Sequence, residues 1–288
     1  MSKKIVLAKL PNAGLGNQLF VLLKALLYGS LHNLPVEVAN YKQYHIGPYL
    51  RREKTNRNYN DYFVFQKNIF SYLIDSTILQ LKMLNNKCTV NPLLSQETEI
   101  CVVFDKLPHW SDYFFELNQH RDIVKELFFN ILKDDILQSY KNYPSPQIGI
   151  HIRMGDFRKL NENEDFAKVG AVRTPLNYFV DVINKLRLWK NENLEATIFS
   201  DGFEHELEPL LSMDNVKLAP QNIDIGDLLY LSKSDIIVTS AGSTFSYWSG
   251  FLSDAPIIMH PDHIHKALRL EQDLFEGSID DFLKHKNS

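Results

Sequence analysis

Short apolar runs alternate with longer amphipathic stretches along most of the chain, a pattern typical of folds that alternate strands and helices. The turn Pro11 to Gly16 lies between the first apolar run and a long apolar segment, as expected between a buried strand and a helix. In the N-terminal half, the pattern predicts strands at 4–8, 35–38 and 99–104 and helices at 17–31, 65–84 and 121–137.

The pattern is interrupted at residues 142–147, where two prolines stand in a polar stretch. Proline disfavours a helix in the residue before it and favours an extended connection. We place a domain boundary there, which divides the chain into residues 1–143 and 144–288.

Beyond this linker the alternation becomes regular. The predicted strands are 148–152, 196–200, 216–219, 236–240 and 257–260, with a helical segment in each gap. Thr174 before Pro175 is typical of a helix start, because the hydroxyl can cap free N–H groups. Such alternation predicts a parallel sheet covered on both faces, and these sheets bind ligands at the carboxyl ends of their strands.

The composition is that of a packed globular protein of one or two domains. The 288 residues are 44% hydrophobic and carry a net charge of −4 (31 basic minus 35 acidic residues), which disfavours a nucleic-acid-binding protein. Two cysteines, Cys88 and Cys101, are too few for a disulfide framework or a four-thiolate zinc site. With no signal peptide and no spanning segment visible, we expect a cytoplasmic protein.

Polar residues follow the first strand of the C-terminal half, in the segment IGIHIRMGDF at 148–157. Arg153 is a planar, permanently charged donor that suits a diphosphate. The alternative is a structural ion pair between Arg153 and Asp156, with His151 satisfied in the core.

Two later predicted strands are also followed by polar residues that could bind a ligand. In TIFSDG at 197–202, Asp201 could accept paired N–H bonds from a purine edge or cap the next helix. In SAGSTFSYW at 240–248, a small-residue turn precedes a helix whose free N–H groups suit an anion, although Ser243 could be a plain N-cap.

Together with GLGNQLF at 14–20, these segments in this order resemble the α-1,2-fucosyltransferase family, which moves fucose from GDP-fucose onto a galactose 2-hydroxyl. The resemblance runs from Ile5 to about Pro261. It implies an α/β fold of the GT-B type, with two Rossmann-like domains and a donor cleft between them, inversion at the anomeric carbon and no divalent metal. Residues 1–143 would form the acceptor-side domain and 144–288 the GDP-fucose domain, with the last helix a candidate to pack back on the N-terminal domain.

The resemblance also assigns roles to residues. Arg153 matches the phosphate ligand, His151 lies near the nucleoside, and Asp201 matches a carboxylate implicated in guanine recognition. The candidates for donor binding are therefore His151, Arg153, Ser200, Asp201 and, in the phosphate-side turn, Ser243, Thr244 and Ser246.

The turn at 14–20 would face the donor domain, where Asn17 and Gln18 could bind fucose or acceptor hydroxyls. An N-cap of the first helix is the alternative for Asn17. A dinucleotide site is disfavoured, because the turn lacks the third glycine of that fingerprint.

Two departures from the family pattern affect the choice of donor. The family's first motif usually carries two successive arginines, whereas the second is Met154 here, and the acidic pair of the second motif is reduced to Asp201-Gly202. Another donor is credible if the missing arginine binds the sugar. Protein O-fucosyltransferases and α-1,6-fucosyltransferases share the general layout, so the linkage is open as well.

The chemistry needs fixed positive charge for the departing diphosphate and a base for the acceptor hydroxyl. Arg153 is the candidate for the first role and Asp156 for the second. Glu162, in the long polar loop 157–170, is the reserve candidate and a possible acceptor contact, unless that loop is simply solvated. No metal-binding pattern follows any strand, so activity in the presence of a chelator is predicted.

A basic segment between residues 41 and 57 stands out in an acidic protein. Interleaved tyrosines suit an anionic membrane surface or a polyprenyl-diphosphate anchor, although a solvated loop is the simpler interpretation. Its charged residues are Lys42, Arg51, Arg52, Lys54 and Arg57, against Glu53 alone.

These observations predict a galactoside 2-α-L-fucosyltransferase of the cytoplasm or inner membrane face, acting in the synthesis of an O-antigen or capsule glycan. The alternatives are a related transferase with another GDP-sugar or linkage, and a non-catalytic nucleotide-sugar binding protein.

Overall fold

The computed structural model describes residues 4–40, 49–50, 59, 61–64, 96–97 and 101–287. The chain forms two compact units, which comprise residues 1–44 with 58–137 and residues 45–57 with 138–288. The helix predicted over 65–84, Cys88 and the five residues of the basic segment lie outside the described residues. Each unit is described by itself.

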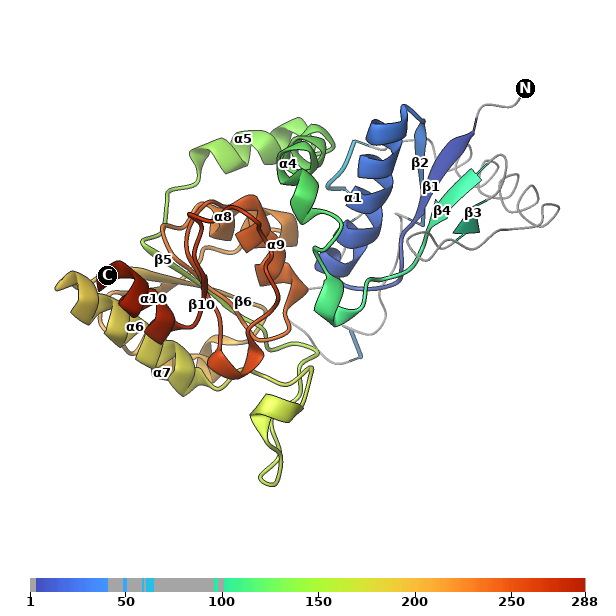
Figure 1. The fold of residues 1–288 in the computed structure, drawn as a ribbon. Coiled ribbons are helices and arrows are strands. Elements are labelled where there is room, and N and C mark those ends of the chain that lie inside the picture. The colour runs from blue at the N-terminus through green and yellow to red at the C-terminus, as the bar shows by residue number, and fades with distance from the viewer. Residues whose placement is uncertain are drawn as a thin grey trace. The chain divides into compact units, whose positions relative to one another are not determined.

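The first unit is built on a sheet of four strands in the order β2-β1-β4-β3 (Figure 1). Its central strands are parallel and β3 is antiparallel to β4. The strands are β1 (Ile5–Lys9), β2 (Val36–Ala39), β3 (Gln96–Glu97) and β4 (Cys101–Phe104). Helix α1 (Leu15–His32) packs against this sheet through an almost continuously buried apolar sequence.

The predicted amphipathic helix over 121–137 is two helices, α4 (Arg121–Asn130) and α5 (Asp134–Asn142). The break has a physical cause outside the helix. The carbonyl of Ile131 accepts the N–H of Val64 at 2.9 Å, and the N–H of Lys133 donates to the carbonyl of Tyr62. These pairings with residues 62–64 replace helical hydrogen bonds, and an apolar periodicity alone does not reveal them.

The second unit is built on six parallel strands in the order β10-β9-β8-β5-β6-β7. The strands are β5 (Ile148–Ile152), β6 (Ala196–Ser200), β7 (Val216–Leu218), β8 (Ile237–Val238), β9 (Ile257–Ile258) and β10 (Glu276–Gly277). The first five confirm the predicted parallel sheet. Strand β10 was not predicted, because two residues without an apolar run carry no strand pattern.

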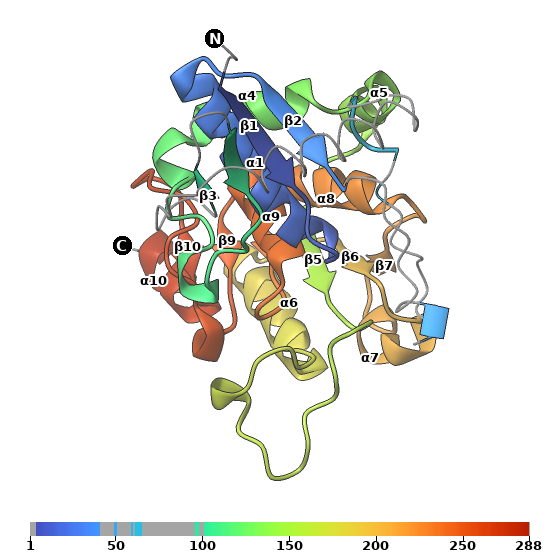
Figure 2. The same ribbon diagram turned by 90° about the vertical axis from the view of Figure 1, so that its right-hand side faces the viewer.

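Helices cover both faces of the second sheet, as Figures 1 and 2 show. One face packs on α6, α7 and α10 in the larger apolar core, and the other packs on α8 in a core that includes Phe199 and Tyr230. The helices are α6 (Leu176–Lys190), α7 (Glu208–Leu211), α8 (Asp224–Ser232), α9 (Thr244–Leu252) and α10 (Ile279–Asn287).

The last helix, α10, packs on α6 of its own unit. The rings of Trp189 and Phe282 meet edge to face at 5.2 Å, and Lys185 pairs with Asp280 at 2.8 Å. Phe282 is fully buried, so α10 belongs to the core of the second unit.

Candidate functional site

The strand order brings the three C-terminal motifs to one place. Strands β5, β6 and β7 extend the sheet in one direction and β8, β9 and β10 in the other, so the order reverses between β5 and β8. Open parallel sheets bind ligands outside the carboxyl ends of the strands at such a reversal. Arg153 follows β5 there, Asp201 follows β6, and Ser240 stands after β8.

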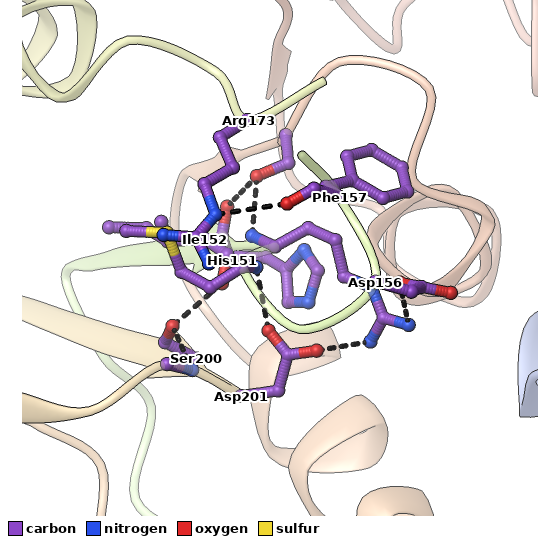
Figure 3. A network of polar contacts seen from close by, with 11 residues as sticks. His151, Ile152, Asp156, Phe157, Arg173, Ser200 and Asp201 are labelled. Atoms are coloured by element: carbon purple, nitrogen blue, oxygen red, sulfur yellow. Dashed lines mark hydrogen bonds and ion pairs between the residues drawn. The ribbon is translucent and has the colours of Figure 1, made fainter. Parts of the chain in front are cut away.

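Two carboxylates, Asp156 and Asp201, hold Arg153; both are labelled in Figure 3. Its Nε and one terminal nitrogen donate to Oδ1 of Asp156 at 2.9 and 2.6 Å, and the other terminal nitrogen pairs with Oδ2 of Asp201 at 2.6 Å. The alternative ion pair between Arg153 and Asp156 is therefore present. The guanidinium also lies 5.9 Å from the ring centre of Phe157.

Asp201 connects two strand ends. Besides pairing with Arg153, its Oδ1 accepts the N–H of Met154 at 2.7 Å. The helix-cap alternative for Asp201 is wrong, because the next helical turn, Glu204–Glu206, begins from Phe203. Asp201 thus orients Arg153, and its predicted contact with guanine stays a prediction.

Two serines hold the end of β5. The hydroxyl of Ser200 donates to the carbonyl of Ile152 at 2.7 Å and accepts the N–H of Gly202 at 3.0 Å. On the other side, the hydroxyl of Ser240 accepts the N–H of Arg153 and donates to the carbonyl of His151, both at 2.9 Å. Ser240 was missed as a site residue, since only the pairing of β5 with β8 shows that it adjoins Arg153.

The two residues that depart from the family pattern, Met154 and Gly202, lie against each other. Met154 is buried in the core, and a Cβ placed on Gly202 would lie 2.7 Å from the Cγ of Met154. Real Cβ atoms do not approach so closely, so the bulk of Met154 requires glycine at position 202. The two departures are one packing unit that holds the end of β5 against the end of β6.

His151 is buried beside Arg153 and stacks on Phe245, with ring centres 4.9 Å apart. Its Nδ1 has no hydrogen-bond partner among the described residues, so the alternative of a satisfied core histidine fails for this atom. Burial lowers the pKa of His151 from 6.5 to about 3, and the charge of Arg153 acts in the same direction. The ring is therefore neutral at physiological pH, and Arg153 is the cation of this site.

The pKa of His151 predicts a loss of stability in acid. Because folded His151 binds a proton more weakly than unfolded His151, stability falls as the pH drops below 6.5 and continues to fall toward about 3. At about pH 4.5 this group should cost about 3 kcal/mol relative to neutral pH. Urea unfolding of the wild type and of His151→Gln at both pH values tests this. Equal pH dependence in the two proteins would show that His151 is not buried in its neutral form.

The turn after β8 is held by residues from other elements. The N–H of Ala241 donates to the hydroxyl of Thr174 at 3.0 Å, and the N–H of Gly242 donates to the hydroxyl of Tyr247 at 2.9 Å. The predicted capping role of Thr174 is therefore wrong. Helix α6 begins from Pro175 without a side-chain cap, because the Thr174 hydroxyl is used by this turn.

Helix α9 begins at Thr244, with Ser243 as its N-cap residue and no side-chain cap hydrogen bond. The hydroxyl of Ser246 donates to the carbonyl of Ser243 at 3.1 Å and is fully buried, so it serves the helix itself. The N–H groups of the first turn have no partner earlier in an α-helix, and their dipole favours an anion. The hydrogen-bond donors that a ligand would meet at this turn are therefore the backbone N–H groups at the start of α9 rather than the hydroxyl of Ser246.

Gly242 has a backbone φ of +69°, in the left-handed region, with open space where a Cβ would lie. Gly242→Ala should therefore cost about 1 kcal/mol through backbone strain alone. We expect a lower unfolding midpoint and weaker binding of GDP, because the strain falls on the turn that leads into α9. Gly170→Ala, which also has open space but no positive φ, is the matched control, and an equal effect of both substitutions would contradict the role of strain.

The polar loop between β5 and α6 extends away from the sheet (Figure 2). A parallel bridge between Arg158 and Val172 closes its base, and Arg173 donates to the carbonyl of Phe157 at 2.9 Å and pairs with Glu206. Glu162 is exposed on this loop. Its role as a base or acceptor contact stays a prediction.

Asn17 and Gln18 lie in the first unit, in the first turn of α1. The N-cap of α1 is Gly14, so the capping alternative for Asn17 is wrong. The side chain of Gln18 is buried and donates to the carbonyl of Ala13 at 3.1 Å, which stabilises the turn before the helix. Their contact with fucose or acceptor stays a prediction.

Among the residues that the structure describes, no helix is long and apolar enough to cross a membrane. The same residues contain no group of three or more histidine, cysteine, aspartate or glutamate side chains that could hold a metal ion.

The fold and the site define a class: a two-unit α/β protein with an arginine held by two carboxylates at the reversal of a parallel sheet. The sequence profile of glycosyl transferase family 11 matches residues 101–259, more than half of the chain. The protein belongs to this family. The predicted resemblance to the GDP-fucose-dependent α-1,2-fucosyltransferases is thereby confirmed, and the protein is a glycosyltransferase.

Solved structures agree on the fold. The fucosyltransferase NodZ from Bradyrhizobium is 12% identical, with a TM-score of 0.52 over 90% of this chain and 95% of that chain. NodZ alpha-1,6-fucosyltransferase soaked with GDP-fucose is also 12% identical, with a TM-score of 0.51 over 89% and 94%. These likenesses confirm the predicted GT-B type of α/β fold. A comparison with curated proteins found no significant match.

Proposed function

We propose that this fucosyltransferase transfers L-fucose, with inversion, from GDP-fucose to the 2-hydroxyl of a galactoside in O-antigen or capsule synthesis. The observation that carries the donor assignment is the position of Arg153, which follows β5 at the sheet reversal and whose backbone N–H donates to Ser240, the residue before the turn that leads into α9. The family match supports the donor and the linkage. The acceptor rests on the family resemblance.

The charges of the site suit a departing diphosphate. Breaking the bond between fucose and GDP places negative charge on the diphosphate, which fixed cations and N–H donors stabilise. Arg153 supplies a planar cation, and the first turn of α9 supplies N–H groups with the positive end of the helix dipole. These groups would stabilise the leaving group without a divalent metal, so we expect full activity in chelator.

The proposal extends to the acceptor side. Asn17 and Gln18 of the first unit and Glu162 of the long loop would contact fucose or acceptor hydroxyls, and the basic segment would hold a lipid-linked acceptor at an anionic membrane. The division between an acceptor-side domain over 1–143 and a donor domain over 144–288, with a donor cleft between them, is part of the same proposal.

A donor screen tests the proposed function. Purified protein is offered GDP-fucose, GDP-mannose or UDP-galactose with lactose or lacto-N-biose, with and without chelator, and GDP or UDP release is measured. We expect release from GDP-fucose alone, unaffected by chelator, and an α-1,2 linkage in the product by NMR. Turnover of GDP-mannose in preference would favour the alternative donor that the Met154 and Gly202 departures leave open. Binding without any turnover would identify a non-catalytic nucleotide-sugar protein.

A further inference from the structure

Every guanidinium nitrogen of Arg153 is engaged by a carboxylate. Asp156 accepts two of its N–H groups on a single oxygen, and the remaining terminal nitrogen forms an ion pair with Oδ2 of Asp201 at 2.6 Å (both carboxylates are labelled in Figure 3). A diphosphate needs the same planar donors. A diphosphate that takes the edge formed by Nε and the terminal nitrogen bound to Asp156 must therefore displace Asp156.

The two carboxylates differ in their exposure to water. Asp201 is 13% exposed, and its second oxygen accepts the N–H of Met154 at 2.7 Å, so it is fastened to the end of β5 as well as to Arg153. Asp156 is 36% exposed and stands three residues after Arg153, in the turn that follows the strand. Water competes with an exposed ion pair and weakens it, whereas a buried carboxylate with a backbone donor is costly to displace.

We infer that Asp156 occupies the diphosphate position on Arg153 before the donor binds, and that the donor displaces Asp156 while Asp201 keeps Arg153 in place. This inference rests on the proposed function of Arg153 as the phosphate ligand. Asp201 is then a positioning residue, and Asp156 is a carboxylate that the donor releases.

The displacement links donor binding to catalysis. While Asp156 accepts two N–H bonds from Arg153, its Oδ1 is occupied; after displacement, that oxygen can accept the proton of the acceptor hydroxyl. In the transfer step the acceptor oxygen forms a bond to the anomeric carbon, and the bond from that carbon to the diphosphate oxygen breaks. The electron pair leaves with GDP, and the hydroxyl proton passes to Asp156. Displacement thus frees Oδ1 of Asp156 for the acceptor hydroxyl when the donor binds.

The test is the direction in which substitution of Asp156 changes GDP affinity. Asp156→Asn and Asp156→Ala remove the competing charge, so both should bind GDP roughly fivefold more tightly than the wild type by calorimetry of the full chain. Transfer from GDP-fucose should fall roughly 100-fold in both. Asp280→Asn removes an exposed carboxylate that pairs with Lys185, far along the sequence from the motifs, and should change neither quantity.

The outcomes separate this inference from the proposed function. If Arg153→Ala weakens GDP binding and neither Asp156 variant binds GDP more tightly, Asp156 supports Arg153 as a phosphate ligand and the displacement is wrong. If GDP binding does not depend on Arg153, the phosphate role fails, and the displacement fails with it. Tighter GDP binding together with undiminished transfer would leave displacement in place and overturn the role of Asp156 as the base.

Discussion

Arg153→Ala should weaken GDP binding roughly 100-fold and lower kcat/KM for GDP-fucose roughly 1,000-fold. Two effects add. The diphosphate loses a bidentate, charged partner, and the negative charges of Asp156 and Asp201 are no longer balanced by the guanidinium beside the phosphate position. Arg153→Lys, which keeps the charge but loses the planar fork, should lie between the wild type and alanine.

Calorimetric titration with GDP and steady-state kinetics measure both quantities. Arg158→Ala is the matched control, because Arg158 is an exposed arginine of the same loop that pairs with Glu164. It should bind GDP as the wild type does. Equal GDP affinity in Arg153→Ala and the wild type would remove Arg153 from the phosphate site.

Met154→Arg should destabilise the protein by about 3 to 5 kcal/mol. This substitution restores the second arginine that the family's first motif usually carries. Here Met154 is 4% exposed within the larger core and fills the space over Gly202, so an arginine would be a buried, unpaired charge. The departure is therefore structural in this chain.

Urea unfolding at neutral pH measures the cost. Leu188→Arg provides the control, since Leu188 of α6 is 80% exposed and its substitution should change stability by no more than about 0.5 kcal/mol. If Met154→Arg were as stable as this control, the side chain at 154 would have to reach solvent. A gain in GDP-fucose affinity in that variant would then assign the position to the donor.

Much of the fold follows from local sequence. The apolar runs predict β5 and β6 at their observed bounds, because strands buried on both faces consist of little else. The strand-end rule also places Arg153 and Asp201 at the ligand edge of the sheet. The sequence did not predict which residues these side chains would hydrogen-bond to. Thr174 has the pattern of a helix cap, yet it bonds the turn at Ala241, because that turn offers an N–H that only the folded sheet brings near.

By itself, the sequence determined the class of fold, the family and the residue types of the proposed donor site. All three properties follow from short segments of the chain, whose residue types and order can be compared directly with known patterns. The tertiary structure decided which carboxylates hold Arg153, that Ser240 adjoins it, and that Met154 and Gly202 are one contact. These facts depend on the order in which β8, β5 and β6 lie side by side, which is set by the packing of helices on the two faces and leaves no local signal.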